Sequence, residues 1–93
     1  MTAGKVTIAN VTMTTGDTEY NYALPAGTQK VLIKLRGTGA VCKLAYVSGQ
    51  SGTTYLTIPA GSSKTIEGIK GTAMTLYFQS PTASQVAEIE SWK

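Results

Sequence analysis

The sequence predicts an all-β fold: a jelly-roll-like, two-layer β-sandwich of roughly eight short antiparallel strands with a two-fold internal repeat. β-Branched residues are abundant, and threonine alone makes up about one residue in six, a composition typical of half-buried pleated strands. Apolar and polar residues alternate with a period of two between closely spaced turn signals. In addition, a strand–turn–strand segment recurs in the second half of the chain.

Roughly eight segments carry a strand pattern, and glycine, proline or polar turn residues bound each of them. Within 30–36, for example, Val31, Ile33 and Leu35 fall on one face and leave the basic side chains on the other. The expected strands, in order, are 5–13, 19–24, 30–36, 40–47, 53–58, 64–69, 74–80 and 83–93.

The first of these strands shows a break in its alternation. Val6 and Ile8 have one parity, whereas Val11 and Met13 have the other. Because a strand that faces one core keeps a single apolar parity, we expect a β-bulge near Asn10 that returns these side chains to one face.

The last segment, 83–93, is the only helix candidate in the sequence, but it has no apolar stripe at helical spacing. Glu88, Glu90 and Trp92 share one parity, while Ile89 has the other. Alternation of this kind favours a strand or an extended tail over a helix.

The internal repeat carries most of the information about architecture. Residues 24–38 read LPAGTQKVLIKLRGT and residues 58–72 read IPAGSSKTIEGIKGT, so the two copies align without gaps. Each copy describes a strand, a Pro-Ala-Gly turn and a returning strand, in which proline presets φ and glycine supplies a positive φ. We expect two related halves packed face to face, with 25–27 and 59–61 in equivalent turns about a pseudo-two-fold axis.

The length of 93 residues indicates a single domain, 1–93. No apolar run approaches the roughly 18 residues that span a bilayer, and no secretory leader is recognisable, so we expect cytoplasmic synthesis and no membrane partner. The net charge of +3 is spread along the chain, and its one basic cluster alternates along the strand 30–36. This favours a solvated strand face over a phosphate-binding stripe, so no nucleic-acid partner is expected.

The composition offers little for catalysis. Histidine does not occur, and only five acidic residues do. Asp17 and Glu19 lie in or beside one turn, where solvated turn residues are favoured over a carboxylate pair or a weak calcium site. Cys42 lies in an apolar run with no histidine to activate it, which indicates a buried side chain. We therefore expect no enzyme, no catalytic residue, no cofactor and no metal site.

The second half of the chain also carries a set of motifs. Residues 55–61 read YLTIPAG, residues 75–83 read TLYFQSPTA, and acidic and apolar residues then alternate up to Trp92. In these features 51–92 resembles a C-terminal module of small bacteriophage virion proteins. The resemblance implies a structural component of a phage particle: a capsid decoration (cement) protein, a head–tail component or a fiber-associated protein. Such a protein is synthesised in the host cytoplasm and located in the virion.

A virion component of this kind acts by protein–protein assembly, so its partners would be copies of itself and other phage virion proteins. Edge strands offer unpaired backbone groups for such contacts. The segment 5–13 is nearly uncharged and has no proline, and a tryptophan near the chain end adds a large apolar side chain. The expected interface residues are Val6, Ile8, Val11, Met13 and Trp92.

A carbohydrate-binding β-sandwich module is the alternative function, because jelly rolls with surface aromatic residues also serve as lectins. It would need two or three coplanar exposed aromatic side chains on one face. A small hydrolase is disfavoured by the lack of histidine. The sequence leaves open the part of the particle, the host and the oligomeric state.

Overall fold

In the computed structural model, which describes residues 6–69 and 73–93, the chain forms strands joined by turns and loops, with no helix among those residues. The all-β prediction is confirmed. The strands are β1 (Val6–Met13), β2 (Tyr20–Ala23), β3 (Lys30–Leu35), β4 (Cys42–Ala45), β5 (Leu56–Ile58), β6 (Ser63–Ile66), β7 (Thr75–Gln79) and β8 (Gln85–Trp92).

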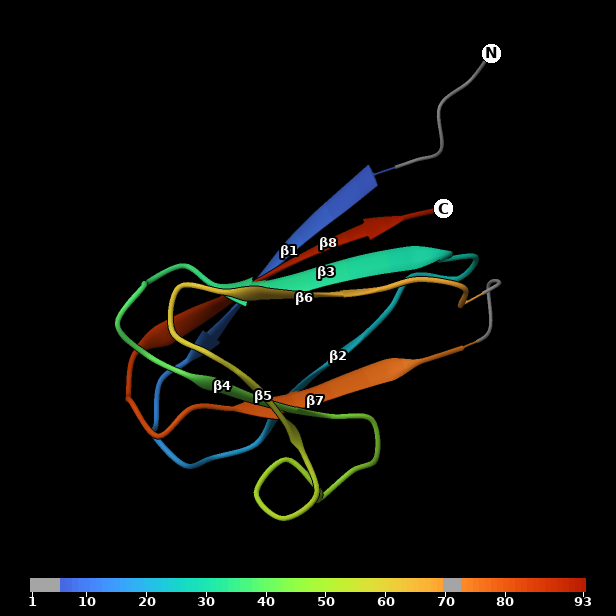
Figure 1. Cartoon of the computed structure of the whole chain (residues 1–93). Helices are drawn as coiled ribbons and strands as arrows, with labels where there is room; N and C mark the ends of the chain where they lie inside the picture. The colour runs from blue at the N-terminus through green and yellow to red at the C-terminus, as the bar shows by residue number, and fades with distance from the viewer. Residues whose placement is uncertain (1–5, 70–72) are drawn as a thin grey trace.

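The strands form two four-stranded antiparallel sheets that lie in two layers (Figure 1). Sheet A has the order β1-β8-β3-β6, and sheet B has the order β2-β7-β4-β5. The pairs β1–β8, β2–β7, β3–β6 and β4–β5 are those of one long hairpin that has been wound between the two sheets. This winding is that of a jelly roll, so the predicted kind of sandwich is also confirmed.

The loop between β4 and β5, residues 46–55, is the tip of this wound hairpin. Among the described strands, β4 and β5 are the one consecutive pair within a single sheet, since every other connection crosses between sheets. The loop therefore extends beyond the two-layer body of the molecule, and it is seen at the bottom of Figure 1.

Alternation places one face of each strand in a shared core. In β3, Val31 and Ile33 are completely buried, while Lys30 and Lys34 occupy the other face. Burial of each such aliphatic side chain contributes about 1.5–3 kcal/mol. The core cluster consists of Met13, Val31, Ile33, Leu35, Ala40, Cys42, Leu44, Ile58, Leu76, Phe78, Ala87 and Ile89.

The bulge expected near Asn10 does not form, so that prediction is wrong. β1 pairs with β8 without interruption along its whole length. Val11 and Met13 face the core, whereas Val6 and Ile8 face solvent. The alternation breaks because the solvent face of β1 is apolar at one end, and the backbone keeps a single register throughout.

The two Pro-Ala-Gly turns have the same local structure. In each, the N–H of the residue after the glycine donates to the proline carbonyl, over 3.2 Å in the first turn and 3.0 Å in the second. Gly27 and Gly61 adopt positive φ angles of 84° and 77°, which fits type II turns with glycine in the third position. Both turns lead from a strand of sheet B to a strand of sheet A.

The two repeated units do not form one layer each, in contrast to the expected packing of two halves face to face. Each unit gives strands to both sheets. The returning strands of the two copies, β3 and β6, are antiparallel neighbours in sheet A, with Val31 opposite Ile66 and Leu32 opposite Thr65. The sequence repeat matches buried Val31 with exposed Thr65, one residue away from this pairing, so the two-fold axis between the two strands does not superpose the copies.

The C-terminal segment forms β8, so the choice of a strand over a helix is confirmed. β8 is an inner strand of sheet A, paired with β1 on one side and β3 on the other. Trp92 lies half-buried on the outer face of the sheet, with the Lys30 ammonium 5.2 Å from its ring centroid. The tail therefore has no unpaired strand edge, so it cannot bind a partner by backbone pairing, which was one of the expected contacts.

Candidate functional site

The exposed large apolar side chains of the described residues fall into two groups. Val6 and Ile8, which are 49% and 68% exposed, lie on the outer face of β1 and are called here the β1 patch. The second group lies at the hairpin tip and is called the loop patch; it consists of Tyr46, Val47, Tyr55 and Leu56. Single apolar residues are normal on a protein surface, but their gathering in one place indicates a contact site.

The loop patch surrounds a hollow of about 360 Å³. Leu44, a completely buried core residue of β4, and its neighbour Ala45 contribute to the lining. Gln50 and Thr54 add polar side chains. The hollow thus combines apolar walls with a few polar groups, as pockets that receive an apolar side chain or a ring do.

A polar network anchored by one carboxylate holds the loop in place. Glu19 accepts hydrogen bonds from the N–H of Gly49 at 2.8 Å, and from the N–H and hydroxyl of Ser51 at 3.0 and 2.6 Å. The buried Ser51 hydroxyl also lies 3.0 Å from the side-chain oxygen of Gln79. The hydrogen bond from the Ser51 hydroxyl, helped by the two backbone N–H groups against the opposing effect of burial, holds the pKa of Glu19 below its ordinary value.

Short-range backbone bonds order the rest of the loop. The N–H of Gln50 donates to the Val47 carbonyl at 3.1 Å, and the N–H groups of Thr53 and Thr54 donate to the Gln50 carbonyl at 3.0 and 2.9 Å. Gly49 turns the chain with a positive φ of 85°. The loop patch is therefore carried by a structured loop, which lowers the entropy that a partner's binding must offset.

A basic side chain contacts Tyr55, one of the residues that line the hollow. The Lys43 ammonium is 5.1 Å from the centroid of the Tyr55 ring, a cation–π contact worth about 0.5–1 kcal/mol at an exposed site. Within the described chain, Lys43 makes no ion pair. Its charge therefore remains available to an acidic group of a partner.

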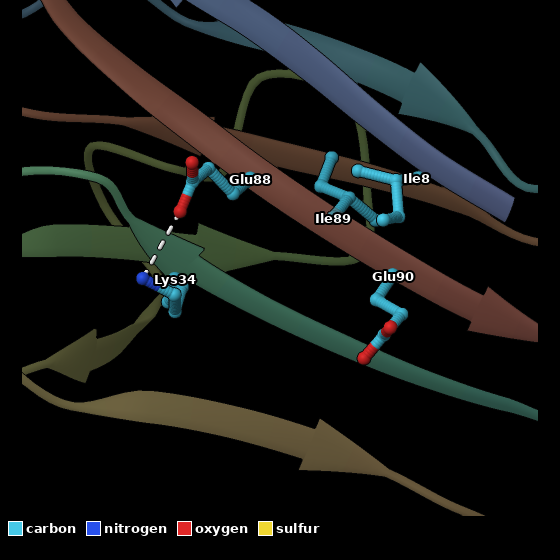
Figure 2. Close-up of a pocket in the computed structure, with 5 residues that line it drawn as sticks. All are labelled: Ile8, Lys34, Glu88, Ile89 and Glu90. Carbon is cyan, nitrogen blue, oxygen red and sulfur yellow. Dashed lines mark ion pairs between the residues drawn. The ribbon is translucent and has the colours of Figure 1, made fainter.

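The β1 patch borders a second hollow, of about 210 Å³, on the outer face of sheet A (Figure 2). Ile8 provides its exposed apolar side chain, Lys34, Glu88 and Glu90 provide charged ones, and the buried Ile89 lies between the two glutamates along β8. Figure 2 shows Glu88 paired with Lys34, while Glu90 points away from that pair.

The two acidic side chains of this hollow differ in their partners. Glu88 lies 3.0 Å from the Lys34 ammonium and 2.8 Å from Nε of Arg36. The hydrogen bond from Arg36, followed by that from Lys34, holds the pKa of Glu88 below its ordinary value. Glu90 pairs with none of the described basic residues and lies directly opposite Ile8 in the β1–β8 register. The β1 patch is thus flanked by a carboxylate that has no ion pair within the described part of the chain.

The residues expected at an interface have different positions in the structure. Val6 and Ile8 are exposed and lie together on β1. Trp92 lies opposite Val6 on the same outer face, half-buried. Met13 is buried in the core, and Val11 packs against the core and is only partly exposed.

The loop patch was not among the expected interface residues. Tyr46 and Val47 were expected to continue a strand, but β4 ends at Ala45. A signal was present in the sequence, since two consecutive large apolar residues of opposite parity cannot both face one core. Glu19 also differs from expectation, because it is a loop anchor and not merely a solvated turn residue.

The cysteine and the potential metal-binding side chains give no sign of a reactive site in the described residues. Cys42 is buried, as expected, and burial raises the pKa of its thiol to about 12. In the part of the chain that the structure describes, no cluster of three or more His, Cys, Asp or Glu side chains could hold a metal ion. No helix long and apolar enough to cross a membrane occurs in 6–69 and 73–93.

Comparisons with known proteins bear on the fold. No protein family and no curated protein matches the chain. Among solved structures, the chain is similar to a de novo designed double-stranded β-helix determined by solution NMR, with a TM-score of 0.57 and 16% sequence identity over 96% of this chain and 99% of that chain. At this identity the likeness shows the fold alone, and it agrees with the wound hairpin described above.

Proposed function

We propose that this chain is a structural component of a bacteriophage virion, a capsid decoration (cement) or head-associated protein that acts by protein–protein assembly. Its partners in this proposal are copies of itself and other virion proteins. The observation that carries the proposal is the gathering of exposed apolar side chains into two patches. An isolated molecule leaves these patches in water, whereas an assembly covers them.

The fold and one sequence block support this choice. Jelly rolls occur in viral capsid proteins, in lectins and in cupins, so the architecture permits the role without selecting it. The TLYFQSPTA block, which resembles phage virion proteins, forms β7 and the turn after it, and places Leu76 and Phe78 in the core. The resemblance therefore lies in residues that build the sandwich.

A carbohydrate-binding module is the second candidate. Tyr46 and Tyr55 favour it, because both line the loop hollow and a sugar ring can stack on a tyrosine face. Val47 and Leu56, exposed beside them, favour a protein partner instead. Aliphatic side chains give sugar hydroxyls no hydrogen-bond partner, whereas they are ordinary members of protein interfaces.

Particle composition tests the leading proposal. Phage particles would be purified on a density gradient from cells carrying the phage that encodes the chain, and analysed by quantitative mass spectrometry. We expect the chain in the particle fraction at a fixed copy number relative to the major capsid protein. Its recovery only in the soluble fraction, with the capsid protein in the particles, would contradict the proposal.

A glycan array tests the second candidate with a matched pair of variants. If the hollow binds sugar, Tyr46→Ala should abolish binding while Val47→Ala retains it, because only the tyrosine offers a stacking face. The virion proposal predicts no saturable glycan binding by the unmodified chain.

A further inference from the structure

The two apolar patches lie at opposite edges of the sandwich. β1 is the first strand of sheet A, on the side where it contacts β2, the first strand of sheet B. β5, which carries Leu56 of the loop patch, is the last strand of sheet B. Figure 1 accordingly shows β1 at the top of the molecule and the 46–55 loop at the bottom. In a symmetric dimer with one two-fold contact, the β1 patch of each copy could cover the loop patch of the other only if both patches lay on the same face of the molecule. Their positions at opposite edges exclude such a dimer.

The patches are also complementary in shape. Ile8 is the most exposed of the large apolar side chains and stands on the outer face of an edge strand. The loop patch surrounds a hollow of about 360 Å³, and the exposed side chains of Tyr46 and Leu56 line it. A branched aliphatic side chain fits such a hollow and would meet apolar atoms on several sides.

Charge distinguishes the two patches in the same complementary way. Glu90 lies beside Ile8 and pairs with none of the described basic residues. Lys43 stands over the ring of Tyr55, which lines the loop hollow, and likewise has no described acidic partner. Placing the β1 patch in the hollow brings the Glu90 carboxylate, which has no ion pair among the described residues, toward the Lys43 ammonium. Opposite charges favour this orientation over contact between like patches.

We propose that copies of this chain associate head to tail, with the β1 patch of one copy seated in the loop patch of the next. The occupant of the hollow is thus a second copy of this chain, a proposal that rests on the assembly function above and makes it specific. Because the contact is heterologous, it repeats from copy to copy, and the product is a closed ring or an open filament.

Two single variants and their mixture test this arrangement by size-exclusion chromatography with light scattering. Ile8→Asp removes the inserted side chain and keeps the hollow, whereas Leu56→Asp blocks the hollow and keeps the inserted side chain. Each variant alone should be a monomer, with association weakened by at least about 100-fold, because a carboxylate would be buried without a partner. An equimolar mixture should form a one-to-one dimer that does not grow, since each copy retains one working patch.

Matched controls guard against loss of folding. Thr65→Asp introduces the same charge at an exposed position of β6, away from both patches, and should associate like the unmodified chain. Circular dichroism and the melting temperature should be unchanged in the Ile8 and Leu56 variants, since both side chains are substantially exposed.

Three outcomes would overturn the head-to-tail contact: an unmodified chain that is monomeric at every concentration, a Leu56→Asp variant that associates normally, or folded variants whose mixture forms no dimer. Normal association of Leu56→Asp together with loss in Ile8→Asp would assign the contact to two β1 edges. These outcomes concern the contact between copies of the chain, whereas its presence in the virion is tested separately by the protein content of purified particles.

Discussion

At the scale of single residues, the loop patch depends on side chains that do not belong to it. Glu19 precedes β2 in the chain, yet its carboxylate fixes Gly49 and Ser51 of the distant loop. The loop lies close enough to Glu19 for this one carboxylate to accept three hydrogen bonds from it. Bonds to a charged acceptor are stronger than neutral ones, so this carboxylate contributes more than an ordinary turn residue does.

Glu19→Ala is expected to lower the free energy of unfolding by about 2 kcal/mol at neutral pH, because the Ser51 group loses its charged acceptor while staying buried. Urea denaturation measures this difference. Glu67→Ala is the matched control, since that exposed side chain makes one long ion pair, to Lys30 at 3.7 Å, and should cost less than about 0.5 kcal/mol. Equal effects of the two substitutions would show that the network does not anchor the loop.

The same carboxylate gives a pH dependence with a defined sign. The pKa of Glu19 is lower in the folded chain than its ordinary value, so its stabilisation is present above that ordinary value and is lost as the pH falls through the lowered one. The stability difference between the unmodified chain and Glu19→Ala should therefore shrink below about pH 4. A difference that stays constant from neutral to strongly acidic pH would contradict this assignment.

Cys42 should be inert in the folded protein. Its side chain is buried and its thiol pKa is raised to about 12, so almost no thiolate exists near neutral pH. An aromatic disulfide reagent should label the protein only in denaturant, at one equivalent per chain. Rapid labelling of the native protein would indicate an accessible thiol.

At the scale of elements, β1 shows what alternation predicts and where it fails. The segment is a strand, as its pattern indicates, but its apolar parity changes because Val6 and Ile8 face solvent. Periodicity alone cannot distinguish a bulge from an apolar outer face, since either one accounts for the same change of apolar parity along the sequence. The choice depends on whether the partner strand pairs continuously, which β8 does.

Two substitutions on this strand distinguish its faces. Met13→Ala should lower the free energy of unfolding by about 3 kcal/mol, because the side chain is completely buried in the core. Ile8→Ala should change it by less than about 0.5 kcal/mol, because the side chain points to solvent. Comparable losses at both positions, measured by chemical denaturation, would favour the bulged register instead.

The two Pro-Ala-Gly turns should respond equally to the same substitution. Gly27→Ala and Gly61→Ala should each cost about 1 kcal/mol, because both glycines have positive φ while an added Cβ would meet nothing closer than 3.9 Å. Gly39→Ala is the control, since an added Cβ there meets nothing within 4 Å and φ is not positive. A loss confined to one of the two turns would show that the copies are not energetically alike.

At the scale of the whole molecule, the sequence predicts the layers better than it predicts the connections. Alternation and turn spacing indicate short strands and two sheets, and the repeated Pro-Ala-Gly turns indicate related segments. The pairing of distant strands, such as β1 with β8, leaves no comparable mark, because many pairings satisfy the same alternation. For this reason the sequence suggested two face-to-face halves, whereas the chain winds as one hairpin.

The candidate site follows the same rule. Val6 and Ile8 are recognisable in the sequence as apolar residues on an uncharged strand. Tyr46 and Leu56 become neighbours of one hollow only when the hairpin tip closes, so their joint role depends on the three-dimensional fold. Sequence patterns report which faces are apolar, and only the packed structure reports which apolar groups are left uncovered.

The central claim is that this molecule works by associating through its uncovered patches, and sedimentation velocity of the unmodified chain over a dilution series tests it most directly. We predict a weight-average sedimentation coefficient that rises continuously between about 1 μM and about 1 mM, the range of affinity that small, transient interfaces give. The species at high concentration should exceed a dimer, because the proposed contact repeats from copy to copy. A single 9.7 kDa species at every concentration would contradict the claim of self-association.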